Sequence, residues 1–439
     1  MQRSFGFWRT WALLVGVMIG NGILLLPALL APYGSWSLLG WVFTGGGTLF
    51  IALMFGSLAR RIPKLGGPYA YTREALGDLP GFLIGWGYWV SLCLATAAGG
   101  VAFAGYFGVF VPSVSSEAVP GAIAALIVIW LFTGINVAGV KSAGIVQLVT
   151  TLLKLLPLFL IAGTGILLGD VTSVPATNPN DESLFALIAG MITITMWAFV
   201  GVEAATIPAD DIIQPEKTIP RALIFGTLTV TSVYILATYG VMALIPGPEL
   251  AVSTSPFADA ALIVFGPWGA TLVTIGALIS IVGGTNGNIL LSGMTIRAVA
   301  LDKLFPSRFA SLSKAGSPAF ALTFAGAFAS VLVVMNYSEG LVSAYKTLIV
   351  LSTLTSVLPY ATSSIADLVL QKRDVASGGL RWKSVLISVG ALGFSLFVIA
   401  GAGFRDASLG LILLAAGYPI YFWLKRKNGV RPTEGADLL

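Results

Sequence analysis

Histidine is absent from this chain of 439 residues, and cysteine occurs only once, at Cys93. Without histidine the chain cannot build a histidine-based catalytic triad or a histidine zinc site. A single cysteine cannot form an internal disulfide, and we expect Cys93, inside an apolar segment, to be a small helix-packing residue. Neither a paired intramembrane aspartate nor a Ser/Lys dyad is visible, so an intramembrane enzyme lacks support and no cofactor is expected.

Charge is also scarce, since 10% of the residues are charged, 56% are hydrophobic and the mean hydropathy is +0.92. A soluble domain of this size needs more charge to cover its surface. Apolar segments of about 20 residues predict a bundle of α-helices in lipid, and they lack the alternation of membrane β-strands. The formal net charge of +5 does not indicate nucleic-acid binding, because the basic residues are scattered over short loops.

The chain is expected to be one all-α transmembrane domain, residues 1–439, with twelve membrane spans. The predicted spans are residues 9–33, 36–58, 80–111, 119–139, 143–169, 183–209, 219–246, 268–300, 317–335, 340–370, 384–402 and 407–424. The segment 59–79 contains Gly66-Gly67-Pro68 and predicts a turn followed by a short interfacial helix.

Lysine and arginine are distributed unevenly over the predicted loops, and this indicates the orientation in the membrane. One set of loops carries Arg60, Arg61, Lys64, Arg73, Lys141, Lys217, Arg221, Lys303, Arg308, Lys314, Lys372, Arg373, Arg381 and Lys383. Both termini are also basic, whereas the opposite loops are mainly acidic, with Lys346 and Arg405 as exceptions. We therefore expect cytoplasmic termini, no cleavable signal peptide, and a location in the cytoplasmic (inner) membrane.

The first predicted span is interrupted in mid-membrane by Gly20-Asn21-Gly22, a sequence that is poor for a continuous helix. Unwound backbone in a bilayer must be buried in protein or line a cavity. A small-residue packing face, with Gly16 and Gly20 as a GxxxG pair, is the alternative. The sixth span favours a break, because Gly201 again interrupts an apolar run and Glu203 follows it. Interrupted spans at corresponding positions of two halves are typical of a transporter binding site.

The two interrupted spans correspond if residues 9–169 and 183–370 form an inverted repeat of five spans each, with two extra helices over 384–424. The amino end of a half-helix attracts a carboxylate, and free carbonyls at the carboxyl end of a half-helix attract an ammonium. One broken pair can therefore hold both ends of an amino acid.

Ionisable residues deep in a span are candidate functional residues, because charge that faces lipid is costly. Lys154 lies well inside the fifth span, where burial disfavours the charged form of an amine, and a snorkelling lysine is the alternative. Glu203 is either a proton carrier or a structural hydrogen-bond partner. Asp367 and Arg297 lie near cytoplasmic span ends, where we expect solvated or interfacial side chains.

The sequence resembles the amino acid–polyamine–organocation superfamily over essentially its whole length, above all its bacterial amino acid permeases and basic amino acid/polyamine antiporters. The matching motifs are Gly20-Asn21-Gly22 with Leu26-Pro27, Gly66-Gly67-Pro68-Tyr69, Trp197 to Glu203, Gln214 to Pro220, Ser255-Pro256-Phe257 and Gly283-Gly284-Thr285-Asn286-Gly287. The resemblance implies the LeuT-type fold with a 5+5 inverted repeat, and transport of amino acids by alternating access.

The resemblance also implies a binding site between spans 1, 3, 6, 8 and 10. Its implied substrate-binding residues are Ile19, Asn21, Gly22, Ile23, Thr96, Trp197, Ala198, Val200, Asn288 and Ser352. The N–H groups of residues 21–23 would bind the substrate carboxylate, and Trp197 would cover the site from the outer side. The carbonyls that face the substrate amine would be those of Ile19, Trp197, Ala198 and Val200. Implied residues of proton coupling or gating are Lys154, Glu203, Tyr88 and Tyr360.

Two positions depart from the arginine/agmatine antiporters of that superfamily. Asn288 matches a tryptophan that stacks on the guanidinium there, and Thr96 matches an asparagine. The loss of a cation–π partner weakens the arginine interpretation. Lys154 matches a lysine of other permeases that occupies a position like a sodium site. The sequence thus predicts sodium-independent, proton-coupled or exchange transport of neutral amino acids, with a basic amino acid/polyamine antiporter as the alternative.

A channel would need a polar ring along a pore, and the sequence shows none. The predicted partners are the amino acid substrate, protons, membrane lipid and a possible second copy of the chain in a homodimer, and nucleic acid is not among them. Trp41, in the second span, is expected to lie outside the site.

Overall fold

The computed structural model describes residues 6–20, 22–62, 66–139, 143–170, 174–179, 181–206, 212–337, 340–375 and 382–427. Within these ranges every named element is a helix, and an isolated β-bridge joins Gly34 and Ala176. Ten helical segments of this part of the chain are long and apolar enough to cross a membrane, and Phe7–Met18 and Lys154–Leu168 are shorter apolar helices. The predicted all-α membrane class is confirmed.

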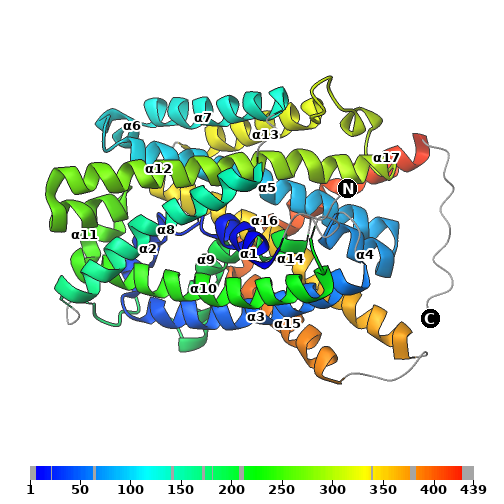
Figure 1. Cartoon of the computed structure of the whole chain (residues 1–439), viewed down its shortest axis with the longest axis horizontal. Coiled ribbons are helices and arrows are strands. Elements are labelled where there is room, and N and C mark those ends of the chain that lie inside the picture. Colours follow the sequence, from blue (N-terminus) through cyan, green and yellow to red (C-terminus); the bar gives the residue numbers. More distant parts are fainter. Residues whose placement is uncertain are drawn as a thin grey trace.

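The helices run mostly alongside one another (Figure 1). Most predicted spans contain one helix or a pair of helices, whereas the first and the sixth each contain three shorter ones. The α-helices are α1 (Phe7–Met18), α2 (Leu26–Leu30), α3 (Trp36–Arg61), α4 (Pro68–Leu76), α5 (Asp78–Phe107), α6 (Pro112–Ser116), α7 (Ala118–Ala138), α8 (Ala143–Leu168), α9 (Leu184–Met196), α10 (Pro215–Leu244), α11 (Gly247–Ala251), α12 (Pro256–Leu301), α13 (Ala319–Asn336), α14 (Leu341–Val375), α15 (Trp382–Gly401), α16 (Gly403–Ala415) and α17 (Gly417–Lys427). Short 3-10 helices are η1 (Ala31–Tyr33), η3 (Trp197–Phe199), η4 (Val202–Thr206) and η6 (Ser307–Ala310).

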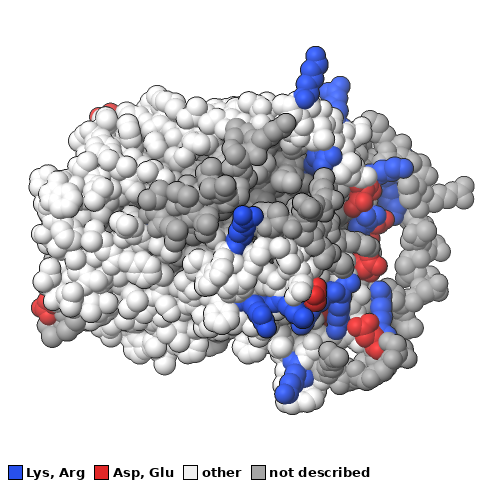
Figure 2. Space-filling view, viewed as in Figure 1, with Lys and Arg blue, Asp and Glu red and all other residues white. Residues whose placement is uncertain are grey.

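The two ends of the molecule differ in charge. Figure 1 shows α4 and α17 near one end and α2, α6 and α11 toward the other. On the face shown in Figure 2, Lys and Arg gather toward the end that holds α4 and α17, with acidic side chains among them, whereas the only charged side chains of described residues visible at the opposite end of this face are acidic. This is the uneven distribution that the loop sequences predict.

Both predicted helix interruptions are present. α1 ends at Met18 and α2 begins only at Leu26, while Asn21 itself lies outside the described residues. In the sixth span the chain passes from α9 into η3 and η4, and Gly201 between them has a φ of 102°, which glycine adopts without strain. A Cβ on Gly201 would lie 2.7 Å from Val17 Cγ1, so the absence of a side chain also lets the two breaks approach each other.

Small residues bring the long helices into backbone contact, as is common between helices in membranes. α5 lies at the centre, where it packs against α12 and α14. α8 and α10 meet at a pair of glycines, and a Cβ on Gly165 would lie only 2.2 Å from Gly240 O. Since that neighbour is backbone and not a flexible side chain, the contact fixes the distance between the two helices.

We expect Gly165→Ala to push α8 away from α10 and to destabilise the protein by about 1–3 kcal/mol, as overpacking typically does. Gly163→Ala is the matched control, because a Cβ there would meet nothing within 4 Å. Thermal unfolding of the purified variants in detergent measures the difference. Equal melting temperatures for both variants would show that the two helices are not held together at these glycines.

Candidate functional site

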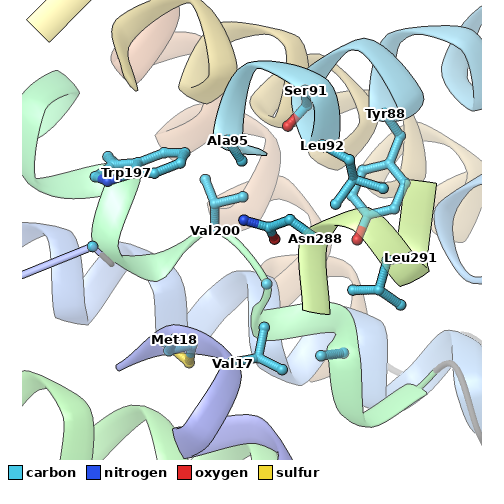
Figure 3. A pocket seen from close by; sticks show the side chains of 13 residues that line it. Val17, Met18, Tyr88, Ser91, Leu92, Ala95, Trp197, Val200, Asn288 and Leu291 are labelled. Atoms are coloured by element: carbon cyan, nitrogen blue, oxygen red, sulfur yellow. The ribbon is translucent and has the colours of Figure 1, made fainter. Parts of the chain in front are cut away.

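A small cavity lies where the two breaks face α5 and α12 (Figure 3). Its lining residues are Val17, Met18, Gly22, Tyr88, Ser91, Leu92, Ala95, Trp197, Val200, Gly201, Ala204, Asn288 and Leu291. The cavity volume is about 30 Å³. A water needs roughly 10–15 Å³ of such space, so the cavity holds water but not an amino acid. If this cavity is the binding site, an amino acid can enter it only when its walls move apart.

Five of the predicted binding and gating residues line this cavity. They are Gly22, Tyr88, Trp197, Val200 and Asn288. In Figure 3 the Asn288 side chain lies between Val200 and Tyr88, with Trp197 on the far side of Val200. The structure thus brings together three features that the sequence predicted for the site: the helix break at Gly22, the aromatic ring of Trp197 and the amide of Asn288.

The remaining predicted binding residues lie behind the cavity wall or outside the described residues. Those that are buried without lining the cavity are Ile19, Ile23, Thr96, Ala198 and Ser352. The Thr96 hydroxyl donates to Leu92 O within its own helix, at 2.8 Å. Asn21, whose N–H the resemblance assigns to the substrate carboxylate, cannot be placed because it lies outside the described residues.

Side chains from several helices donate hydrogen bonds to the carbonyl oxygens of the interrupted first span. The donors are Tyr234 to Met18 O at 2.6 Å, Ser280 to Gly20 O at 3.0 Å, and Tyr106 to Leu24 O at 2.8 Å. These oxygens lack the partners that a continuous helix would supply, and an unpaired polar group is costly where no water can reach it. The donors belong to α10, α12 and α5, so the broken span is tied to three neighbouring helices.

Tyr234 also joins the two breaks to each other. Its hydroxyl lies 2.6 Å from Met18 O and 3.1 Å from Ala198 O, so both carbonyls share its single hydrogen. The Trp197 carbonyl accepts from Val200 N–H at 3.2 Å. Two of the carbonyls that the resemblance directs toward a substrate amine are therefore already hydrogen-bonded in this closed arrangement.

Lys154 of α8 lies between α1 and α12. Its side chain is 3% exposed, and its Nζ donates to Gly16 O of α1 at 3.3 Å. A Cβ on Gly283 of α12 would lie 3.3 Å from Nζ, so this glycine leaves room for the amine. The lysine of α8 is thus buried against α1 and α12 instead of extending to solvent.

Glu203 ties the second break to two long helices. It is fully buried, with Oε1 accepting from Tyr88 OH at 2.6 Å and Oε2 accepting from Tyr360 OH at 2.6 Å. The Tyr360 hydroxyl in turn accepts from Gly201 N–H at 3.3 Å. The carboxylate therefore acts as a structural hydrogen-bond partner here, and its role as a proton carrier stays a prediction.

α14 contacts the site through the predicted Ser352 and also through Tyr345 and Ser356, which the sequence did not identify. Trp197 Nε1 donates to Tyr345 OH at 3.2 Å. Ser352 Oγ donates to Ser91 O at 2.9 Å, and Ser91 is also hydrogen-bonded to Ser356. Hydroxyl groups inside apolar spans were the only available signal, because the sequence does not say which helix face meets which neighbour.

Trp41 does not line the cavity, as the sequence predicts for a residue of the second span, but it lies close behind the cavity wall. Its ring lies 4.9 Å from the Tyr234 ring and 6.1 Å from the Phe199 ring, centroid to centroid. Trp41 therefore packs directly behind the second break without reaching the cavity.

The prediction that Asp367 is solvated or interfacial is wrong. It is fully buried, and its Oδ2 accepts from Ser388 Oγ at 2.6 Å and from Gln371 Nε2 at 2.7 Å. Arg61 NH1 lies 3.4 Å from its other oxygen. The carboxylate thus joins α14 to α3 and α15.

A second polar cluster closes the charged end of the molecule near α4. Arg73 lies 2.7 Å from Asp302 and 2.8 Å from Asp78, and Tyr69 OH donates to Asp302 at 2.6 Å. Burial, followed by the hydrogen bond to Asp302, raises the pKa of the Tyr69 hydroxyl well above its ordinary value, so it remains a donor at neutral pH. The cluster links α4, α5 and the end of α12.

We expect Tyr234→Phe to destabilise the fold by about 1–3 kcal/mol, because the Met18 and Ala198 carbonyls lose their buried donor. Tyr337→Phe is the control, since the Tyr337 hydroxyl has no hydrogen-bond partner among the described residues. Thermal unfolding in detergent compares the two variants with the parent protein. If Tyr337→Phe is as harmful as Tyr234→Phe, bridging of the two breaks by this hydroxyl contributes nothing measurable.

Comparison with known proteins places the chain in a family. Residues 5–411 match the family model described as amino acid permease. A Bacillus subtilis (strain 168) protein named as a candidate arginine/ornithine antiporter is 31% identical, over 97% of this chain and 98% of its own length. The putrescine transporter PotE of Escherichia coli (strain K12) is 27% identical, over 94% and 95%. The cadaverine/lysine antiporter of the same strain is 30% identical over 83% of both chains.

The matched region includes both helix breaks and the whole cavity. The relatives are multi-pass transporters and not enzymes, in agreement with the resemblance seen in the sequence. The chain therefore belongs to the amino acid permease family of the amino acid–polyamine–organocation superfamily.

Proposed function

We propose that this protein is an antiporter of basic amino acids or polyamines, which it exchanges across the bacterial cytoplasmic membrane by alternating access. The observation that carries the proposal is the set of relatives, whose names give arginine, ornithine, lysine, putrescine and cadaverine as substrates. Arginine, ornithine and lysine each carry a cationic side chain in addition to the amino acid zwitterion. Putrescine and cadaverine carry two ammonium groups and no carboxylate. The alternative of the sequence analysis thus has more support than its main hypothesis of a neutral substrate.

The cavity offers two features that suit a cationic group. The Trp197 ring borders it, and cations are attracted to the face of an aromatic ring. The Tyr88 hydroxyl also borders it and is bound to the Glu203 carboxylate, which lies one side chain behind the wall. A diamine has no carboxylate, so recognition shared by amino acids and polyamines must rest on such cation-binding groups. The N–H groups of residues 21–23 would serve the carboxylate of the amino acid alone.

A neutral amino acid is the second candidate, and the composition of the cavity wall favours it. Among the described lining residues none carries a formal charge, and Asn288 is an amide. A cation in this cavity would have to approach Glu203 through Tyr88 or lie against Trp197 without an ion pair. The two candidates differ in the substrates that they predict, so transport assays separate them.

The proposed mechanism assumes the LeuT-type arrangement of twelve spans in one domain, with inverted repeats over 9–169 and 183–370 and extra helices over 384–424. The interrupted helices at corresponding positions of the two repeats support it. The gathering of Lys and Arg toward one end supports an orientation with cytoplasmic termini (Figure 2). A homodimer in the membrane stays a prediction.

The substrate class is tested by counterflow into proteoliposomes that contain the purified protein. We expect internal arginine, ornithine, lysine, putrescine or cadaverine to accelerate uptake of at least one labelled member of this set. Internal alanine, leucine and serine should not accelerate it. Trp197→Ala should lower the exchange rate at least tenfold, because the cavity loses its aromatic wall. Acceleration by the neutral amino acids alone would favour the second candidate and overturn the proposal.

The coupling ion is tested by the same assay with and without sodium, across a series of pH values. We expect no sodium requirement, because the buried Lys154 amine donates to Gly16 O of α1 and lies next to α12, where its family counterpart stands in place of the ion. Net transport should vary with pH, and Lys154→Ala should reduce it and flatten the profile. A strict sodium requirement would contradict the assignment. A normal profile in Lys154→Ala, together with loss in Glu203→Gln, would move the proton site to Glu203.

A further inference from the structure

A second cavity opens on the surface of the helix bundle, between the amino half of α1 and α10. Its described lining residues are Phe7, Trp8, Trp11, Arg221, Phe225 and Thr229, and its volume is about 540 Å³. It shares none of these residues with the substrate cavity. We call it the α1–α10 groove.

The groove has a charged end and an apolar length. Arg221, Phe225 and Thr229 are spaced four residues apart, so they follow one face of α10 over roughly 12 Å. Arg221 lies near the amino end of α10, which begins at Pro215, and Lys217 stands one turn before it. Arg221 thus forms the charged end of the groove, with Lys217 one turn before it and outside the lining, and an aromatic side chain follows along the same face.

Both walls carry aromatic side chains, with Phe7, Trp8 and Trp11 on α1 and Phe225 on α10. Trp8 and Phe225 are 70% and 57% exposed, which leaves large apolar surfaces uncovered by protein. The Phe7 and Phe225 rings meet edge to face at 6.0 Å, and Trp11 Nε1 donates to Thr229 Oγ1 at 3.4 Å. These two contacts join α1 to α10 at Phe225 and at Thr229, beyond the charged end at Arg221.

We propose that the α1–α10 groove binds one anionic phospholipid, with the phosphate at Arg221 and an acyl chain along Phe225 and Trp8. Tryptophan and basic residues gather at the headgroup level of membranes, and basic pockets between helices bind anionic headgroups. A soluble anion would leave the aromatic side chains of the groove without an apolar partner. A zwitterionic lipid would bring an ammonium group next to Arg221 and Lys217, so the two cations select a net negative headgroup.

The bound lipid would influence the substrate cavity through α1. The same twelve-residue helix carries Phe7 and Trp8 in the groove at one end and Met18 in the cavity at the other, with Val17 beside it. A lipid that fills the groove stabilises the position of α1 seen here, and a ligand that prefers one conformation shifts the population toward it. Anionic lipid should therefore favour the closed arrangement of the site.

The test uses the purified full-length protein in neutral detergent, with thermal unfolding and native mass spectrometry as readouts. Phosphatidylglycerol should raise the melting temperature more than phosphatidylcholine does, and inorganic phosphate alone should not raise it. Arg221→Gln should weaken phosphatidylglycerol binding about fivefold, the typical effect of one basic residue near anionic lipid. Lys217→Gln should weaken it in the same direction. Phe225→Ala should weaken the binding of both lipids, because the acyl chain loses the aromatic side chain that it packs against.

Arg308→Gln is the matched control, because Arg308 is exposed, carries the same charge and does not line the groove. It should bind phosphatidylglycerol like the parent protein. Equal binding of the two lipids by the parent protein would overturn the proposal, as would equal losses in Arg308→Gln and Arg221→Gln. If Arg221→Gln does not purify as a single species, the proposal is tested by phosphatidylglycerol binding to Lys217→Gln and Phe225→Ala, each compared with Arg308→Gln. Binding is measured without transport, so failure of the proposed substrate class leaves this test unaffected.

Discussion

The site depends on one constraint, namely that backbone carbonyls exposed by a helix break inside a membrane must find other donors. Tyr234, Ser280 and Tyr106 supply them to the first span, and Lys154 supplies a further donor at Gly16. These side chains belong to four different helices, so the break is stable only when α5, α8, α10 and α12 are all in place. The irregular backbone that forms the cavity is thus a property of the whole bundle.

α14 holds the second break on both sides of the cavity. Tyr345 bonds to Trp197, whereas Tyr360 bonds to Glu203 and to the Gly201 N–H. With both contacts made, the cavity is only about 30 Å³ in volume. Tyr345 and Tyr360 do not line the cavity themselves, so α14 fixes the second break from behind the cavity wall.

The sequence predicted those features that follow from single residues in an apolar context. Low charge and long apolar runs indicated the helical membrane class, and Gly20, Gly22 and Gly201 marked the two breaks. Lys154 was singled out as a candidate functional residue because charge that faces lipid is costly. The sequence did not reveal Tyr234 or the burial of Asp367, because a hydroxyl or carboxylate in a span does not indicate which neighbour it meets. These partners are set by helix packing, which a single sequence does not encode in any local pattern.

The central claim is that substrate binds at the two breaks, between Gly22, Trp197 and Asn288. A structure determined with the substrate identified by counterflow tests it most directly. The account predicts density for the substrate between these three residues, in a cavity enlarged by movement of α14 or α1, with the substrate cation nearest Trp197 or Tyr88. Substrate density elsewhere in the bundle, with this cavity still closed, would contradict it.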